Sequence, residues 1–84
     1  MKLWIFTSKT CSPCRTLKTS LASFDLSIPV KYKDVVENQK EAFDFRVRSL
    51  PTLCLVDENN ALIATHSGLI PPTSIQEFID EHSS

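Results

Sequence analysis

The sequence predicts an α/β fold in which helices cover both faces of a four-stranded mixed sheet. Runs of strand length alternate with amphipathic helical patterns in the order β-α-β-α-β-β-α. The opening βαβ unit requires a parallel strand pair, whereas the last two strands are close enough in sequence to form a hairpin. With 84 residues, 42% of them hydrophobic, the chain has room for one domain, residues 1–84, built around one modest core.

The first half of the chain supplies the βαβ unit. Residues 2–7 contain the apolar run Leu3-Trp4-Ile5-Phe6, which is typical of a buried strand. From Ser12 to about Phe24, apolar side chains recur at the spacing of one helix face. Residues 28–34 alternate apolar and charged side chains, which predicts a second strand, with Pro29 at its start or at a sheet edge.

The second half begins with a short helix and a hairpin. Asn38, followed three residues later by Glu41, resembles a helix N-cap with its reciprocal partner and predicts a helix that ends near Arg46. The apolar run 53–56 predicts a central strand, and the polar residues 57–60 predict a turn into a returning strand over residues 61–67.

A last helix is expected after Gly68, which breaks the returning strand. Thr73 with Gln76, or Ser74 with Glu77, has the spacing of a helix start. The apolar face of this helix consists of Ile75, Phe78 and Ile79.

The composition excludes several functional classes. A net charge of −1, from nine basic and ten acidic residues, gives no electrostatic basis for binding nucleic acid or an anionic membrane. No apolar run is long enough for a transmembrane span or a signal peptide. Three cysteines are an odd number, which argues against the disulfide framework of a secreted protein. We therefore expect a cytoplasmic protein, and we expect it to act as a monomer.

The chemistry centres on the segment Thr10-Cys11-Ser12-Pro13-Cys14. Two cysteines separated by two residues, between a strand and a helix, can form a disulfide that is readily reduced and re-formed. Pro13 suits the first turn of a helix, where its missing N–H costs nothing. Cys11 then lies at the helix N-terminus, where free N–H groups and the helix dipole stabilise a thiolate. Arg15 and Lys18 follow on the same helix, either as solvated charges or as a source of positive potential near the thiols.

Three blocks of sequence carry a resemblance to a known family. The segment Thr10–Cys14 resembles a redox-active motif, and residues 47–53 resemble the segment that faces this motif in the family. Residues 67–69 and 75–79 resemble the family's closing strand end and last helix. On these blocks the chain is identified as a small member of the thioredoxin superfamily, a mini-thioredoxin with glutaredoxin-like size. The resemblance implies the thioredoxin fold and a thiol–disulfide oxidoreductase that reduces protein disulfides, with no cofactor beyond its own disulfide and no metal.

The resemblance also implies roles for individual residues. Cys11 would be the attacking nucleophile, and Cys14 would be the buried thiol that resolves the mixed disulfide. Pro51 would follow a cis peptide bond and present the backbone of Leu50 to an extended substrate. Gly68 would let the substrate backbone approach closely. The implied substrate-binding residues are Thr10, Ser12, Pro13, Leu50, Pro51 and Gly68, and the Ser12 hydroxyl could also hydrogen-bond a thiolate.

Two departures from the family pattern bear on mechanism and partners. The position of a buried acid that assists the resolving cysteine is occupied by Ile5, so that water or a nearby base such as Lys33 would have to help. The glutathione-binding pattern of glutaredoxins is poorly matched by residues 49–51 and 67–69. We therefore expect protein disulfides as substrates, ribonucleotide reductase as a candidate target, and thioredoxin reductase as the electron donor. A glutathione-dependent glutaredoxin is the alternative.

Two further alternatives are a structural zinc site and a non-catalytic docking module. A zinc site would take Cys11, Cys14, Cys54 and His66, although structural zinc sites usually have two close ligand pairs and this chain has one. Cys54 lies in an apolar run and is expected to be a core thiol. The intact pair of cysteines argues against a module that only docks.

Overall fold

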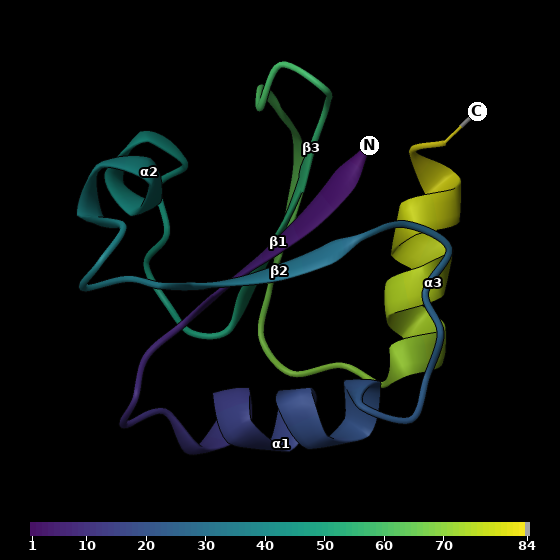
Figure 1. The fold of residues 1–84 in the computed structure, drawn as a ribbon, viewed down its shortest axis with the longest axis horizontal. Helices are drawn as coiled ribbons and strands as arrows, with labels where there is room; N and C mark the ends of the chain where they lie inside the picture. The colour runs from purple at the N-terminus through teal and green to yellow at the C-terminus, as the bar shows by residue number, and fades with distance from the viewer. Residues whose placement is uncertain (84) are drawn as a thin grey trace.

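The computed structural model describes residues 1–83 and confirms the expected order of elements; Ser84 lies outside the described residues. The strands are β1 (Lys2–Thr7), β2 (Val30–Asp34), β3 (Thr52–Val56) and β4 (Leu62–Ser67), and the helices are α1 (Ser12–Leu21), α2 (Gln39–Asp44) and α3 (Pro72–Glu81). The sheet has the order β2-β1-β3-β4, with β1 parallel to β2 and the other two pairs antiparallel (Figure 1). No helix within residues 1–83 is long and apolar enough to cross a membrane.

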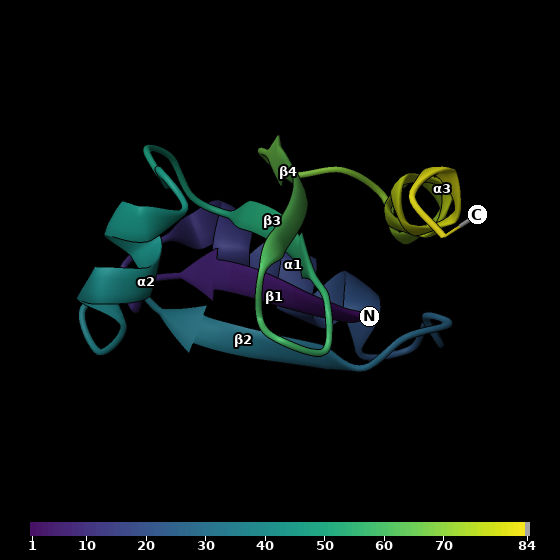
Figure 2. The ribbon, with the colours of Figure 1, turned by 90° about the horizontal axis from the view of Figure 1, so that it is seen from above.

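The central strand β1 is buried on both faces, which explains its continuous apolar run. Leu3 and Ile5 point to one face, where α1 and α3 contribute Leu17, Leu21, Ile75 and Ile79 to the core. Trp4 and Phe6 point to the other face, where Ala42 of α2 packs beside Cys54 and Val56. Figure 1 shows α1 and α3 on one side of the strands and α2 on the other, and Figure 2 shows α2 and α3 at opposite ends of the molecule. The expectation of helices on both faces is confirmed.

Several element boundaries differ from the sequence prediction. Helix α1 ends at Leu21 rather than Phe24, because the N–H of Phe24 turns back to the carbonyl of Leu21 and redirects the chain toward β2. Strand β2 begins at Val30, after Pro29, whose carbonyl accepts a hydrogen bond from the N–H of Leu3. Strand β4 begins one residue later than predicted, at Leu62.

Asn38 occupies the predicted N-cap position of α2, but the predicted capping bonds do not form there, and the predicted start of α3 is wrong. Asn38 makes no side-chain cap, and its amide donates to the carbonyl of Asp34 at 2.9 Å. Glu41 does not reach back to the N-cap, because both of its oxygens accept from Lys33 Nζ at 2.9 Å. Helix α3 starts at Pro72 rather than at Thr73 or Ser74. A proline in the first turn lacks the N–H that a cap would have to satisfy.

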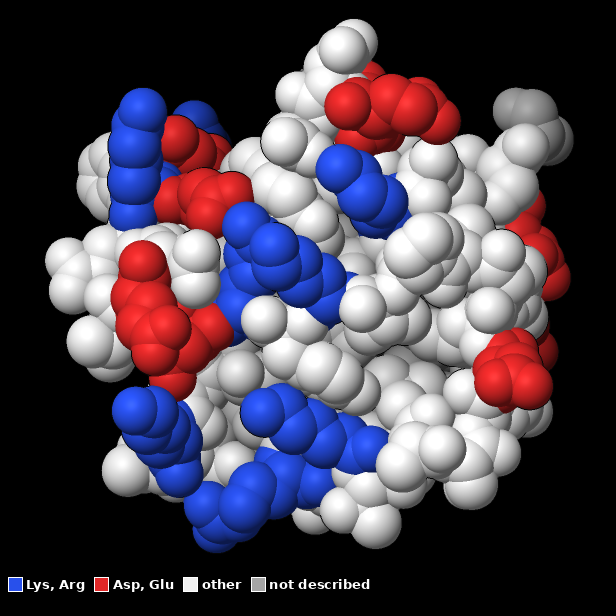
Figure 3. All heavy atoms as spheres, in the orientation of Figure 1, with Lys and Arg blue, Asp and Glu red and all other residues white. Residues whose placement is uncertain are grey.

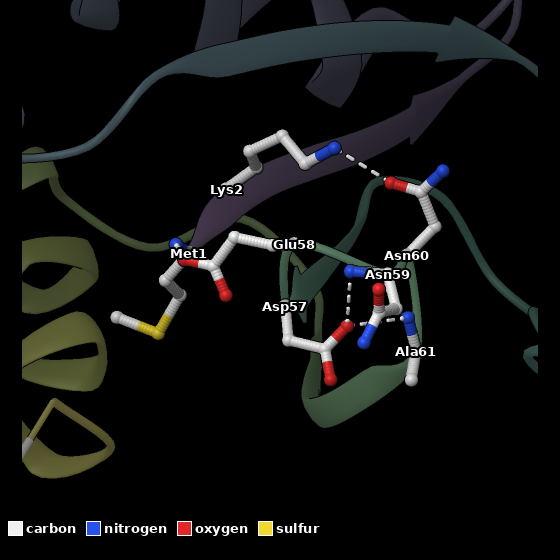
Figure 4. Close-up of polar contacts among 7 residues, drawn as sticks. All are labelled: Met1, Lys2, Asp57, Glu58, Asn59, Asn60 and Ala61. Atoms are coloured by element: carbon white, nitrogen blue, oxygen red, sulfur yellow. Dashed lines mark hydrogen bonds and ion pairs between the residues drawn. The ribbon is translucent and has the colours of Figure 1, made fainter.

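The turn between β3 and β4 lies at the end of the sheet where β1 begins (Figure 4). Asp57 Oδ1 accepts hydrogen bonds from the N–H groups of Asn59 and Ala61, at 2.8 and 2.9 Å. Asn60 has a left-handed backbone conformation, with φ of 63°. Its side-chain oxygen accepts from Lys2 Nζ at 2.6 Å, and the amino group of Met1 pairs with Glu58 at 3.0 Å. These contacts tie the start of β1 to the hairpin.

Asn60 supports a test of this turn by a pair of substitutions. N60A should lower the free energy of unfolding by about 1 kcal/mol relative to N60G, because alanine resists a positive φ and glycine does not. Both variants lose the exposed contact to Lys2, so their difference isolates the backbone effect. Urea unfolding followed by tryptophan fluorescence measures it, and equal midpoints would contradict the assignment.

Candidate active site

The two cysteines of the sequence motif lie at the start of α1, just after β1. Cys11 is half-buried and Cys14 is 1% exposed. The two form a disulfide, with a Cα–Cα distance of 5.2 Å. A hydrogen bond from the N–H of Cys11 to the carbonyl of Ser8, at 3.3 Å, closes the turn between β1 and α1. The partly exposed sulfur therefore belongs to Cys11, as the sequence predicts.

Cys11 is the N-cap residue of α1, and its sulfur accepts the capping hydrogen bond. Its backbone is extended, with φ of −90°, and its Sγ accepts a hydrogen bond from the N–H of Cys14 at 3.2 Å. Pro13 occupies the first turn without a free N–H, as expected. The helix therefore directs an N–H group and the positive end of its dipole at this sulfur. The same arrangement favours negative charge on Cys11 when the disulfide is reduced.

Ser12 is held by Arg15, a contact that sequence reasoning missed. The Arg15 guanidinium donates to Ser12 Oγ at 3.1 Å and to the carbonyl of Lys9 at 3.3 Å. The Ser12 oxygen, expected near a thiolate, is thus engaged with an arginine in this structure. Ser12 and Arg15 are three residues apart on a helix, a spacing that brings two side chains together and could have indicated this contact. Lys18, one turn later, lies over the ring of Tyr32 at 5.0 Å instead.

The segments expected to face the cysteines lie at the same end of the sheet. Because Phe6 pairs with Thr52, the Leu50–Pro51 segment before β3 lies beside the end of β1 that leads to Cys11. The peptide bond between Leu50 and Pro51 is cis, as the resemblance implied. Thr10 is exposed near this edge, and its hydroxyl lies 3.5 Å from that of Ser8.

Gly68 lies at the same end of the sheet, directly after β4. Thr52 also pairs with Ser67, the last residue of β4, so Gly68 follows directly beside the Pro51 segment. The N–H of Gly68 donates to the carbonyl of Pro51 at 2.8 Å. Its φ of 101° strongly favours glycine, and no heavy atom lies within 4 Å of the place where a Cβ would stand. The space above Gly68 is therefore open.

The expected helper base is wrong, because Lys33 lies on the opposite face of the sheet from α1. Its Nζ binds Glu41 of α2 at 2.9 Å and lies 3.7 Å from the centre of the Trp4 ring. Ile5, at the position of the family's buried acid, belongs to the apolar cluster beneath α1. Neither Lys33 nor Ile5 therefore offers a base that could take the proton from the Cys14 thiol.

The structure does not bring together the four residues of the zinc alternative. Cys54 is buried on the α2 face of the sheet, and burial raises the pKa of its thiol to about 12. His66 lies near the Phe78 ring of α3, with the ring centres 6.1 Å apart. In the described part of the chain, no group of three or more His, Cys, Asp or Glu side chains could hold a metal ion. Cys54 is a core thiol, as predicted.

Comparison with known proteins agrees with this geometry. The Thioredoxin family model matches residues 2–81. The chain is 33% identical to a thioredoxin of Haemophilus influenzae over 76 residues, which cover 86% of this chain and 70% of the relative, and 34% identical to one of Bacillus subtilis, covering 86% and 72%. A solved mutant thioredoxin from Halobacterium salinarum superposes with a TM-score of 0.84 at 26% identity, covering 99% of this chain and 74% of that one.

Cys54 gives a prediction about thiol reactivity. With a pKa of about 12, only about one Cys54 in 10⁴ is a thiolate at pH 8, and only the thiolate is alkylated. In the reduced, folded protein, iodoacetamide should modify Cys11 first and leave Cys54 unmodified, as mass spectrometry of the digested protein will report. Cys54 should react once the protein is unfolded in urea. Equal rates for Cys54 in the folded and unfolded protein would contradict its burial.

Proposed function

The chain belongs to the thioredoxin family and is a thiol–disulfide oxidoreductase, and we propose that it reduces disulfide bonds in other proteins with Cys11 as nucleophile and Cys14 as resolving thiol. The observation that carries the proposal is the hydrogen bond from the N–H of Cys14 to Cys11 Sγ at the start of α1. It selects Cys11, the more exposed sulfur, as the one on which negative charge is stabilised.

The proposed reaction has two exchange steps. The Cys11 thiolate attacks one sulfur of a substrate disulfide; the substrate S–S bond breaks, and its other sulfur leaves as a thiolate that takes up a proton. Cys14 then loses its proton to water and attacks Cys11 in the mixed disulfide. The second substrate sulfur leaves and is protonated, and the Cys11–Cys14 disulfide forms. Two electrons have then passed to the substrate, and this disulfide is the only redox group that the reaction requires.

We propose that the substrate binds as an extended segment along Leu50, with Gly68 beside it. Within residues 1–83 the backbone of Leu50 has no hydrogen-bond partner, so it is free to pair with an added strand. The open space above Gly68 accommodates the backbone of such a segment. Thr10, Ser12 and Pro13 flank Cys11 in the sequence, are exposed, and would complete the contact surface.

We further propose thioredoxin reductase as the electron donor, ribonucleotide reductase as a candidate target and the cytoplasm as the location. The relatives are thioredoxins, which does not favour the glutaredoxin alternative. A reductase that uses NADPH would return two electrons to the Cys11–Cys14 disulfide. The odd number of cysteines supports a reducing compartment.

Substitution of each cysteine tests the assigned roles. C11S should lower the rate of insulin reduction to that of dithiothreitol alone, because the exposed nucleophile is gone and the remaining cysteines are buried. Reduced C14S, freed of dithiothreitol and mixed with insulin, should form a mixed disulfide that persists, because no thiol is present to resolve it. Turbidity of precipitating insulin chains and mass spectrometry of the trapped adduct are the measurements. If C11S keeps the wild-type rate, Cys11 is not the nucleophile.

A comparison of donors tests the proposed electron source. The oxidised protein should be reduced by NADPH with thioredoxin reductase, and slowly or not at all by glutathione with glutathione reductase. NADPH consumption in the presence of insulin measures both. Efficient turnover with glutathione alone would reverse the assignment and restore the glutaredoxin alternative.

A further inference from the structure

An exposed aromatic and two arginines surround a hollow beside the candidate active site. The hollow, of about 530 Å³, is lined by Ala42, Phe43, Asp44, Arg46, Val47 and Arg48, and we call this surface the Phe43 patch. Phe43 is 83% exposed, more than any other large hydrophobic side chain of the described residues. A single exposed apolar side chain is ordinary on a protein surface, but this one stands at the rim of a hollow that also carries positive charge.

The Phe43 patch adjoins in sequence the segment that the proposed function assigns to substrate binding, and both pack on the same part of the core. Arg48 precedes Leu50 by two residues, and Val47 and Leu50 pack against the same core cluster beneath α2. A hydrogen bond from the N–H of Val47 to the carbonyl of Ala42, at 2.9 Å, fixes this segment to the helix. Figures 1 and 2 place α2 and the loop between β1 and α1 at the same end of the molecule.

Arg46 occupies a backbone conformation in which an arginine is unusual. Its φ is 56°, and glycine or asparagine adopts this left-handed region at lower cost. The Arg46 side chain is exposed and makes no ion pair or hydrogen bond within residues 1–83, and the same holds for Arg48. The fold therefore gains no contact from either guanidinium that would offset the cost at Arg46.

The charge around the patch selects the kind of partner. Arg46 and Arg48 line the hollow, and Lys9 and Arg15 lie close to Cys11 in the sequence, where the Arg15 guanidinium donates to the carbonyl of Lys9. Figure 3 shows Lys and Arg side chains over α1, and side chains of both charges in the region of α2. Asp44 is the one acidic residue that lines the hollow. Unpaired guanidinium groups bind carboxylates, and an exposed aromatic ring at a hollow binds an apolar side chain.

We propose that the Phe43 patch binds an acidic segment of the substrate protein that carries an apolar residue and lies next to the disulfide to be reduced. The proposal rests on the proposed function, because the segment is positioned by the same substrate whose sulfur Cys11 attacks. The apolar residue packs on Phe43, and the flanking carboxylates pair with Arg46 and Arg48. Disulfides with acidic surroundings are then reduced faster than others.

Two synthetic peptides provide the test. Each contains one cysteine in a mixed disulfide with thionitrobenzoate, whose release is coloured, and each has a leucine close to the cysteine. In one peptide glutamates flank the leucine, and in the other lysines take their place. The reduced wild-type protein should react about fivefold faster with the glutamate peptide at low salt, and added salt should shrink this ratio.

Variants locate the preference on the patch. R46G should keep its stability, since glycine adopts a positive φ freely, but should reduce the glutamate-to-lysine rate ratio by about half. F43A should slow the leucine-containing glutamate peptide by about threefold relative to a matched peptide with serine in place of leucine. K40A is the control: it removes an exposed charge from the same helix outside the hollow and should leave both ratios as in the wild type.

The outcomes separate this inference from the proposed function. If the wild type releases thionitrobenzoate from neither peptide nor from the small symmetric disulfide of thionitrobenzoate, the proposed function fails. If it reacts with all three but shows no preference for the glutamate peptide, only the role of the patch is overturned. A preference that persists in R46G, or that K40A lowers as much as R46G, overturns it as well.

Discussion

Burial of Cys14 at the start of α1 determines where the other sulfur of the pair can lie. Cys14 is 1% exposed, and the next turns of the helix bury Leu17 and Leu21 against β1. Each fully buried leucine contributes about 1.5–3 kcal/mol, so the helix start is held by the core of the domain. Cys11, three residues earlier, is thereby placed at the N-cap, where its sulfur meets the N–H of Cys14. The reactive geometry and the stability of the fold depend on the same contacts.

The pairing of β1 with β3 is the second constraint on the site. This register brings the end of β1, the start of β3 and the end of β4 to the same end of the sheet. The segments that carry Cys11, Pro51 and Gly68 meet there. Loops placed on a rigid sheet in this way commonly carry function. At the opposite end of the sheet, polar contacts around Asp57 and Asn60 hold the hairpin turn and tie it to the start of β1.

The cationic side chains of this small domain differ in whether their charged groups are engaged by contacts within the fold. Lys33 is nearly buried, pairs with Glu41 and covers the Trp4 ring, so its charge serves the packing of α2 on the sheet. Arg15 braces the first turn of α1 through Ser12 and the carbonyl of Lys9. Arg46 and Arg48 make neither kind of contact among the described residues, which is why they are available to a partner.

The sequence alone determined the order of elements, the buried strand β1 and the pairing of Cys11 with Cys14, because apolar periodicity and short-range spacing act locally. The starts of α1 and α2 could also be predicted, but the capping bond of α2 could not. Glu41 has the spacing of a capping partner, but the fold offers it the buried ammonium of Lys33, a stronger competitor. Likewise, only the tertiary structure decided that Lys33 and Cys54 face α2 and not α1. The face of the sheet on which a side chain lies depends on strand register, and register is set by contacts between residues far apart in the sequence.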